Sequence, residues 1–139
     1  MPKKPKATPE MIIKEVTREA ILALNLVPEK DVLIDQVNPD WDGAPRIYIL
    51  SEPTKPDSET QFGVIAAETL LKIAVIAKER QQTWDIIRAA VRAAYDKWTL
   101  MEQTPKSGLL SAVYAEHNIS QIPERNEFHA YFSFKMLHK

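Results

Sequence analysis

Histidines and carboxylates are the residues of this sequence whose chemistry could support catalysis or metal binding. The chain has three histidines, at positions 117, 129 and 138, and no cysteine. A zinc site of the HExxH kind needs two histidines four positions apart on one helix, and no pair of these histidines has that spacing. Glu116 and His117 are adjacent on an expected strand, where a surface histidine explains them without a ligand role. The spacing therefore predicts no metal site.

A second candidate is the pair of carboxylates Asp40 and Asp42, which flank Trp41. Paired carboxylates could share general acid and base roles, but the segment NPDWDGAP has the composition of a turn, which accounts for both residues without catalysis. The chain has neither GxxxxGK[ST] nor GxGxxG, and its three glycines leave little material for a phosphate-binding loop. We expect a protein that is not an enzyme and that binds no cofactor or metal.

Composition indicates one folded domain. The chain has 139 residues, 45% of them hydrophobic and 27% charged, and its net charge is -1, which is typical of neither disordered nor membrane proteins. No run approaches the roughly 18 apolar residues of a transmembrane helix, and the charge gives no general reason to expect nucleic-acid binding. No apolar segment follows the basic start MPKKPKA, so it is not a signal peptide. We expect a flexible basic tail at 1–7 and a single cytosolic domain at 8–139.

Hydrophobic periodicity predicts two helices and five strands. Thr8, Pro9 and Glu10 have the order of a helix start, and Thr83 is the expected cap of a second helix. The second helix has an apolar stripe that begins at Trp84. The expected elements are a helix from 8 to about 25, strands at 31–37, 46–52, 68–78, 109–119 and 128–137, and a helix at 83–98.

The last expected strand alternates between apolar and polar residues, so one of its faces should be buried. We expect Phe132 and Phe134 to be buried on the face of the sheet that the helices cover, together with Trp84, Val91 and Ile73. His129 should lie on the opposite face. The element order fits an α+β fold, a mainly antiparallel or mixed sheet of about four to five strands with two helices packed on one face. The sequence leaves open whether the connection across helix 83–98 is parallel or antiparallel.

Two further features concern polar residues. The segment SEPTKPDSETQFG, residues 51–63, separates two apolar strands, and polar connections of this length are usually functional or disordered; we expect a long mobile loop at 53–63. Residues 29–60 contain eight acids and three bases, whereas residues 78–97 contain five bases and three acids. These are either two solvated faces or complementary surfaces through which copies of the chain join head to tail.

The order of elements from residue 8 to residue 137 resembles that of the tail terminator (tail completion) proteins of long-tailed bacteriophages. An opening helix and a strand are followed by the strand PRIYI with Ser51 and Glu52 at its end. A polar loop, the strand ETLLKIAVIAK, the amphipathic helix TWDIIRAAVRAAYDKW and two last strands complete the pattern.

This resemblance implies a hexameric ring at the head-proximal end of the tail tube, in the virion and, during assembly, in the host cytoplasm. The ring would stop tube polymerisation and offer a surface to the head connector, and DNA would pass through it without sequence-specific recognition. The expected partners are further copies, the major tail tube protein and the connector, with no membrane and no catalytic residue. The candidate residues for the ring or partner interface are Lys55, Asp57, Glu59, Phe62, Arg80, Arg88 and Arg92.

Two alternatives remain open at this point. A head-tail joining protein of the phage neck is also a ring former without chemistry, and the sequence has no feature that separates it from a tail terminator. A ligand-binding α+β regulatory domain would instead need a pocket rimmed by polar groups, for which Trp41 and Tyr48 are the candidates.

Overall fold

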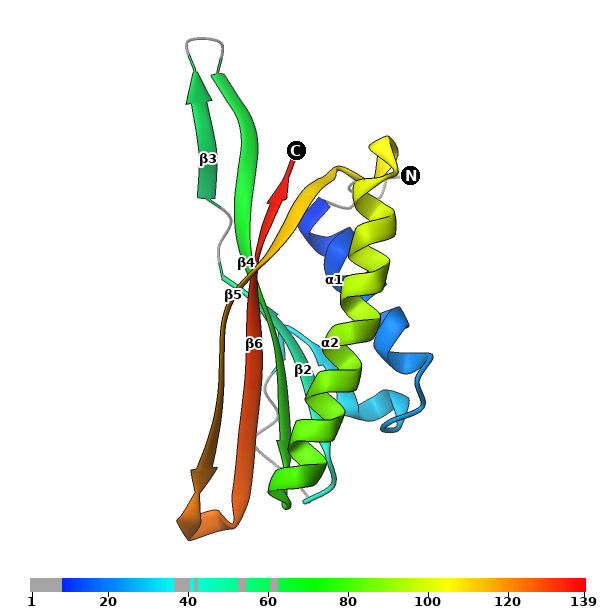
Figure 1. The fold of residues 1–139 in the computed structure, drawn as a ribbon, viewed down its shortest axis with the longest axis vertical. Coiled ribbons are helices and arrows are strands. Elements are labelled where there is room, and N and C mark those ends of the chain that lie inside the picture. The colour runs from blue at the N-terminus through cyan, green and yellow to red at the C-terminus, as the bar shows by residue number, and fades with distance from the viewer. Residues whose placement is uncertain (1–8, 37–40, 42, 53–54, 61–62) are drawn as a thin grey trace, which may run out of the picture.

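The computed structural model describes residues 9–36, 41, 43–52, 55–60 and 63–139. It contains two long helices, α1 (Pro9–Leu22) and α2 (Arg80–Glu102), and six strands: β1 (Val32–Ile34), β2 (Arg46–Ser51), β3 (Lys55–Thr60), β4 (Gly63–Ala77), β5 (Leu109–Ile122) and β6 (Glu127–His138). Both helices lie on one face of the sheet (Figure 1). The predicted α+β fold is confirmed. Within the described ranges, no helix is long and apolar enough to cross a membrane.

The sheet is mixed, with the strand order β1-β2-β4-β6-β5, and β3 pairs with the outer part of β4. β1 runs parallel to β2, whereas β2 with β4, β4 with β6 and β5 with β6 are antiparallel pairs. Because β4 and β5 are both antiparallel to β6, they run in the same direction. The connection across α2 is therefore a parallel crossover that passes over β6, which answers the question that the sequence left open.

Both helices differ from their predicted bounds. α1 ends at Leu22 rather than near residue 25, and Asn25 just beyond it has a positive φ of 54°, a conformation that asparagine tolerates and that ends a helix. α2 begins three residues before Thr83, which is buried inside the helix and is not its cap. The Thr83 hydroxyl donates to the carbonyl of Glu79 at 2.7 Å. A threonine within a helix satisfies its hydroxyl in this way.

The core lies between the sheet and the helices. α1 packs on β1, β2 and α2, while α2 packs on β4, β5 and β6. Trp98 is fully buried, and its indole ring meets the Phe134 ring edge-on at a centroid distance of 4.8 Å. Phe134 and Ile73 are buried as predicted. Three further apolar residues, Trp84, Val91 and Phe132, were expected to be buried but are only half-buried. α1 packs on β1, β2 and α2, and among the described residues no helix other than α2 packs on β5 and β6.

The polar segment 53–63 is not the irregular loop that we expected. Residues Lys55–Thr60 form β3, which pairs antiparallel with β4, and β4 begins at Gly63 rather than at 68. This hairpin extends past the ends of both helices (Figure 1). Pro56 is compatible with β3 because β3 is an edge strand, where a missing N–H is tolerated. Residues 53–54 and 61–62 lie outside the described chain, and mobility of the segment stays a prediction.

Candidate functional site

Each of the three histidines has a neighbour that accounts for its position. His117 stacks on an aromatic ring of β6 and hydrogen-bonds to the Tyr114 hydroxyl. His129 contacts the Glu127 carboxylate at 3.0 Å, and His138 contacts the hydroxyl of a buried β4 threonine at 2.8 Å. In the part of the chain that the structure describes, no group of His, Asp and Glu could hold a metal ion. The histidines therefore have structural partners.

Tyr131 of β6 and the segment around Trp41 contain the remaining candidate groups. Partial burial on the open face of the sheet and the Glu116 carboxylate raise the pKa of the Tyr131 phenol above its ordinary value. The phenol is therefore protonated at neutral pH and cannot act there as a base. Asp40 and Asp42 lie outside the described residues. The Trp41 indole between them donates to the carbonyl of Ala44 at 2.6 Å.

Several acids of the segment 29–60 are already paired with cations of the same chain. Asp31 is buried and accepts from the Arg46 guanidinium at 3.2 Å. Asp35 forms an ion pair with Lys14, an almost fully buried lysine of α1. Glu29 lies 3.8 Å from a guanidinium nitrogen on α1. The charges of these three acids are therefore offset within the fold, and whether the remaining acids of the segment form a partner surface stays a prediction.

The basic residues of α2 instead form an exposed stripe. Arg80, Trp84, Arg88 and Arg92 follow one another at intervals of four residues, a spacing that places them on one face of a helix. The three arginines are exposed, and the Arg88 guanidinium lies 5.9 Å from the centre of the Trp84 ring. Among the described residues, none of the three makes an ion pair. We call these four residues the basic stripe.

A hollow surface runs beside the basic stripe. One part, of about 400 Å³, is lined by Trp84, Val91, Tyr95 and Phe132 together with Arg88, Arg92 and Asp96. The other part, of about 620 Å³, is lined by Trp84, Arg80, Gln81 and Ile119. Because Trp84 belongs to both, we treat them as one surface, the α2 groove. Tyr114 of β5, with 49% of its surface exposed, stands next to Phe132 at a ring distance of 6.2 Å.

The seven candidate interface residues fall into two groups that the fold does not bring together. Lys55, Asp57 and Glu59 belong to β3, and Phe62 lies outside the described residues. Arg80 begins α2. The start of α2 and the strand β3 lie at opposite ends of the molecule (Figure 1). Any contact between the two groups must therefore join different chains.

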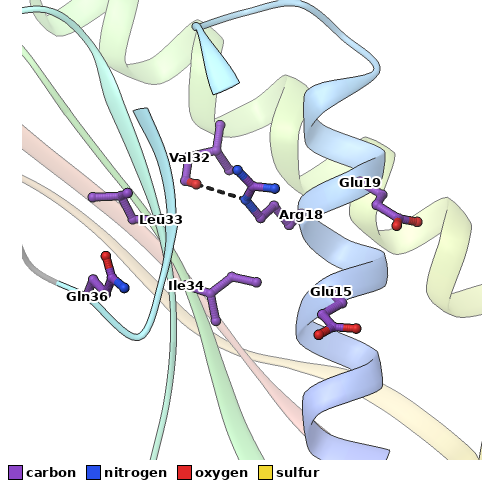
Figure 2. A pocket seen from close by; sticks show the side chains of 7 residues that line it. All are labelled: Glu15, Arg18, Glu19, Val32, Leu33, Ile34 and Gln36. Carbon is purple, nitrogen blue, oxygen red and sulfur yellow. Dashed lines mark hydrogen bonds between the residues drawn. The ribbon is translucent and has the colours of Figure 1, made fainter. Parts of the chain in front are cut away.

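A second hollow, which contains none of the predicted site residues, lies between α1 and β1 at the far edge of the sheet. It has a volume of about 440 Å³ and is lined by Glu15, Arg18, Glu19, Val32, Leu33, Ile34 and Gln36. Figure 2 shows Arg18 reaching across it, where its Nε donates to the carbonyl of Val32 at 3.0 Å. Glu15 and Glu19 are exposed and form no ion pair with any described residue. Their four-residue spacing on an exposed helix face was the sequence signal for this surface.

Comparison with known proteins identifies a similar fold. No family model and no curated protein matches the chain. Among solved structures, a chain of the virion of a native gene transfer agent particle has a TM-score of 0.58 at 15% sequence identity, over 90% of this chain and 92% of that chain. A crystal structure from Akkermansia muciniphila aligns with 98% of this chain and 80% of its own, at 12% identity and a TM-score of 0.37, which is too low to support an argument. The first match shows that the two chains share a fold.

Proposed function

We propose that this protein is a structural component of a phage-like particle, without catalytic activity, that forms a ring at the head-proximal end of the tail tube. There it stops tube polymerisation and provides the surface to which the head joins. The observation that supports this proposal most is the fold shared with a gene transfer agent virion chain over nearly the full length of both chains. The resemblance of residues 8–137 to tail terminator proteins is what supports the proposed position in the particle.

The distribution of surfaces also supports a ring. A ring of identical subunits needs two different patches on each copy, so that one patch binds the other patch of the next copy. This chain has the α2 groove beside β5 and β6 and a second hollow beside β1. Because β1 and β5 are the two ends of the strand order, the patches lie at opposite edges of the sheet.

The β3–β4 hairpin is the element best placed to contact a different protein. It extends beyond the layer of the sheet that the helices cover (Figure 1), and β3 pairs with β4 alone among the described strands. We assign Lys55, Asp57, Glu59 and Phe62 to contacts with the tube protein or the head connector. Arg80, Arg88 and Arg92 are assigned to the contact between copies.

The test is an assembly reaction with polymerising tail tube protein. Purified protein should bind one end of each tube, in about six copies as expected for a closed ring of this family, and should halt elongation. Electron microscopy with labelled protein gives the position, and tube length gives the effect on growth. Decoration along the tube wall, or unchanged tube growth, would contradict the proposal. Binding to isolated head connectors without binding to tube ends would instead identify a head-tail joining protein of the neck.

A further inference from the structure

The α2 groove has the features of a binding surface. Its apolar part is formed by Trp84, Phe132 and Val91, which pack against the core but remain half-exposed. Tryptophan and arginine are the residue types that contribute most to binding free energy at protein interfaces, and the basic stripe supplies one tryptophan and three arginines. An exposed apolar surface with a charged rim marks an interaction site.

The opposite edge of the sheet has a surface of complementary charge. On α1, Glu15 and Glu19 are exposed, and beside them the half-buried Leu33 and Ile34 of β1 supply apolar atoms to the same hollow. Figure 2 shows Arg18 reaching from α1 toward β1, whereas the Glu19 side chain points away from β1 and Glu15 lies on the near side of the helix. Among the described residues, neither acid has a cationic partner, so both carboxylates are available to a neighbouring copy.

We propose that the α2 groove of one copy binds the α1–β1 edge of the next copy, with Arg88 and Arg92 facing the neighbour's Glu15 and Glu19. This inference rests on the proposed function, because it names the surfaces through which the ring closes. It differs from the sequence-based expectation in the acidic partner, which is α1 rather than residues 29–60.

The spacing of the charges supports this match. Arg88 and Arg92 are four residues apart on α2, and Glu15 and Glu19 are four residues apart on α1. Four residues correspond to a rise of about 6 Å on either helix. Two helices that pack side by side can therefore form two ion pairs at once, and they can do so whether they run parallel or antiparallel.

Because the two surfaces lie on different sides of the molecule, each contact leaves one surface free on each copy, and further copies can add. The α2 groove lies on the β5–β6 side of α2, whereas α1 lies on the β1–β2 side. A contact between them leaves a free groove on one copy and a free α1 edge on the other, so it is heterologous and closes only in a ring. Apolar contacts at Trp84 and Phe132 supply binding free energy, while the charges fix register and exclude a groove-to-groove contact, in which arginines would face arginines.

Charge reversal tests the proposal. The variant Arg88→Glu/Arg92→Glu and the variant Glu15→Lys/Glu19→Lys each place like charges in every contact. For each variant alone, we expect the dissociation constant of self-association at low salt to be at least about tenfold higher than that of the wild type. In an equimolar mixture both kinds of contact are again complementary, so association should return with the two variants in a ratio of one to one. Sedimentation equilibrium and native mass spectrometry measure both effects.

A matched control separates this contact from net charge. Lys97→Glu/Lys135→Glu changes the net charge by the same amount at two exposed lysines outside the α2 groove, and it should associate as the wild type does. Circular dichroism should show equal folding for all variants. Unaffected association in either reversed variant, failure of the mixture to associate, or no association of the wild type up to millimolar concentration at low salt would overturn the proposal. Association that requires a different partner protein would also overturn it.

The two proposals can fail separately. If the wild-type protein caps tail tubes but charge reversal leaves capping and association unchanged, the contact surfaces are wrong and the function stands. If the mixture experiment succeeds but no variant or wild-type protein binds tube ends, the contact is right and the tail terminator function is wrong.

Discussion

The hydrogen bond between α1 and α2 allows a sharp prediction about what holds α1 in place. The indole N–H of Trp98 donates to the Thr17 hydroxyl at 2.8 Å, and that hydroxyl donates to the carbonyl of Ile13 at 2.7 Å. Thr17 and Trp98 are both fully buried. The replacement Thr17→Val keeps the shape of the side chain and removes its hydroxyl, so the indole N–H loses its acceptor in a place that water does not reach.

The expected loss follows from this burial. A buried donor without an acceptor costs about 1–3 kcal/mol, and the added methyl group of valine recovers a fraction of that. We therefore expect Thr17→Val to lower the free energy of unfolding by about 1–2 kcal/mol. For a chain of this size, about 4 °C of melting temperature corresponds to each kcal/mol, so the midpoint should fall by roughly 4–8 °C.

A double-mutant cycle isolates the hydrogen bond from the packing. Trp98→Phe removes the donor, and in that background Thr17→Val should cost little, because no N–H is left unpaired. Urea denaturation of the four proteins, followed by circular dichroism, gives the coupling free energy. Equal losses from Thr17→Val in the presence of tryptophan and of phenylalanine would refute the reasoning, and so would a wild-type midpoint for Thr17→Val alone. In either case the contact would contribute through packing only.

Three further predictions concern the core, a buried ion pair and the hairpin. Phe134→Ala should lower the free energy of unfolding, measured by urea denaturation, by about 3–5 kcal/mol. Phe132→Ala should lower it clearly less because its ring is half-exposed, and His129→Ala should change it little. Equal losses at the two phenylalanines would contradict the assigned burial. Asp31→Ala should cost about 3–5 kcal/mol, because it removes one partner of a buried ion pair. A loss below 1 kcal/mol, roughly that of an exposed pair, would argue against burial of the pair. A Gly/Ser linker of equal length in place of Thr54–Gln61 should lower the melting temperature only modestly, because it removes an edge strand that pairs with β4 alone among the described strands. Tails should become overlong or fail to join heads, and normal tails would reduce the segment to a passive connection.

Local patterns in the sequence were sufficient to predict most elements and the fold class. The alternation in β6 placed Phe134 in the core. The apolar spacing in α2 predicted an amphipathic helix, but Trp84 and Val91, which we expected to be buried, are only half-buried. These signals are local, because the period of two in a strand and of 3.6 in a helix appears in any chain that has one buried face. The half-exposure of Phe132 was not predictable in this way, because it depends on where α1 ends up relative to α2.

β3 and the parallel crossover from β4 to β5 depend on the tertiary structure and were not predictable from local sequence. β3 contains Pro56 and charged residues and has no apolar alternation, so its pairing depends on the extended partner strand that β4 provides. The parallel relation of β4 and β5 likewise depends on β6 inserting between them. A strand that gains its backbone hydrogen bonds from a distant segment leaves little trace in its own side chains.

The sequence by itself determined how many charges the surface has, and the fold decided which of them remain available. Residues 29–60 are acidic in composition, but Lys14, Arg18 and Arg46 come from other parts of the chain to pair with acids there. Glu15 and Glu19 were not among the interface residues predicted from the sequence, yet the fold leaves them exposed at the sheet edge opposite the basic stripe. The physical reason is that the interaction between charges depends on their distance and burial in space, and only the tertiary structure sets these for residues far apart along the chain.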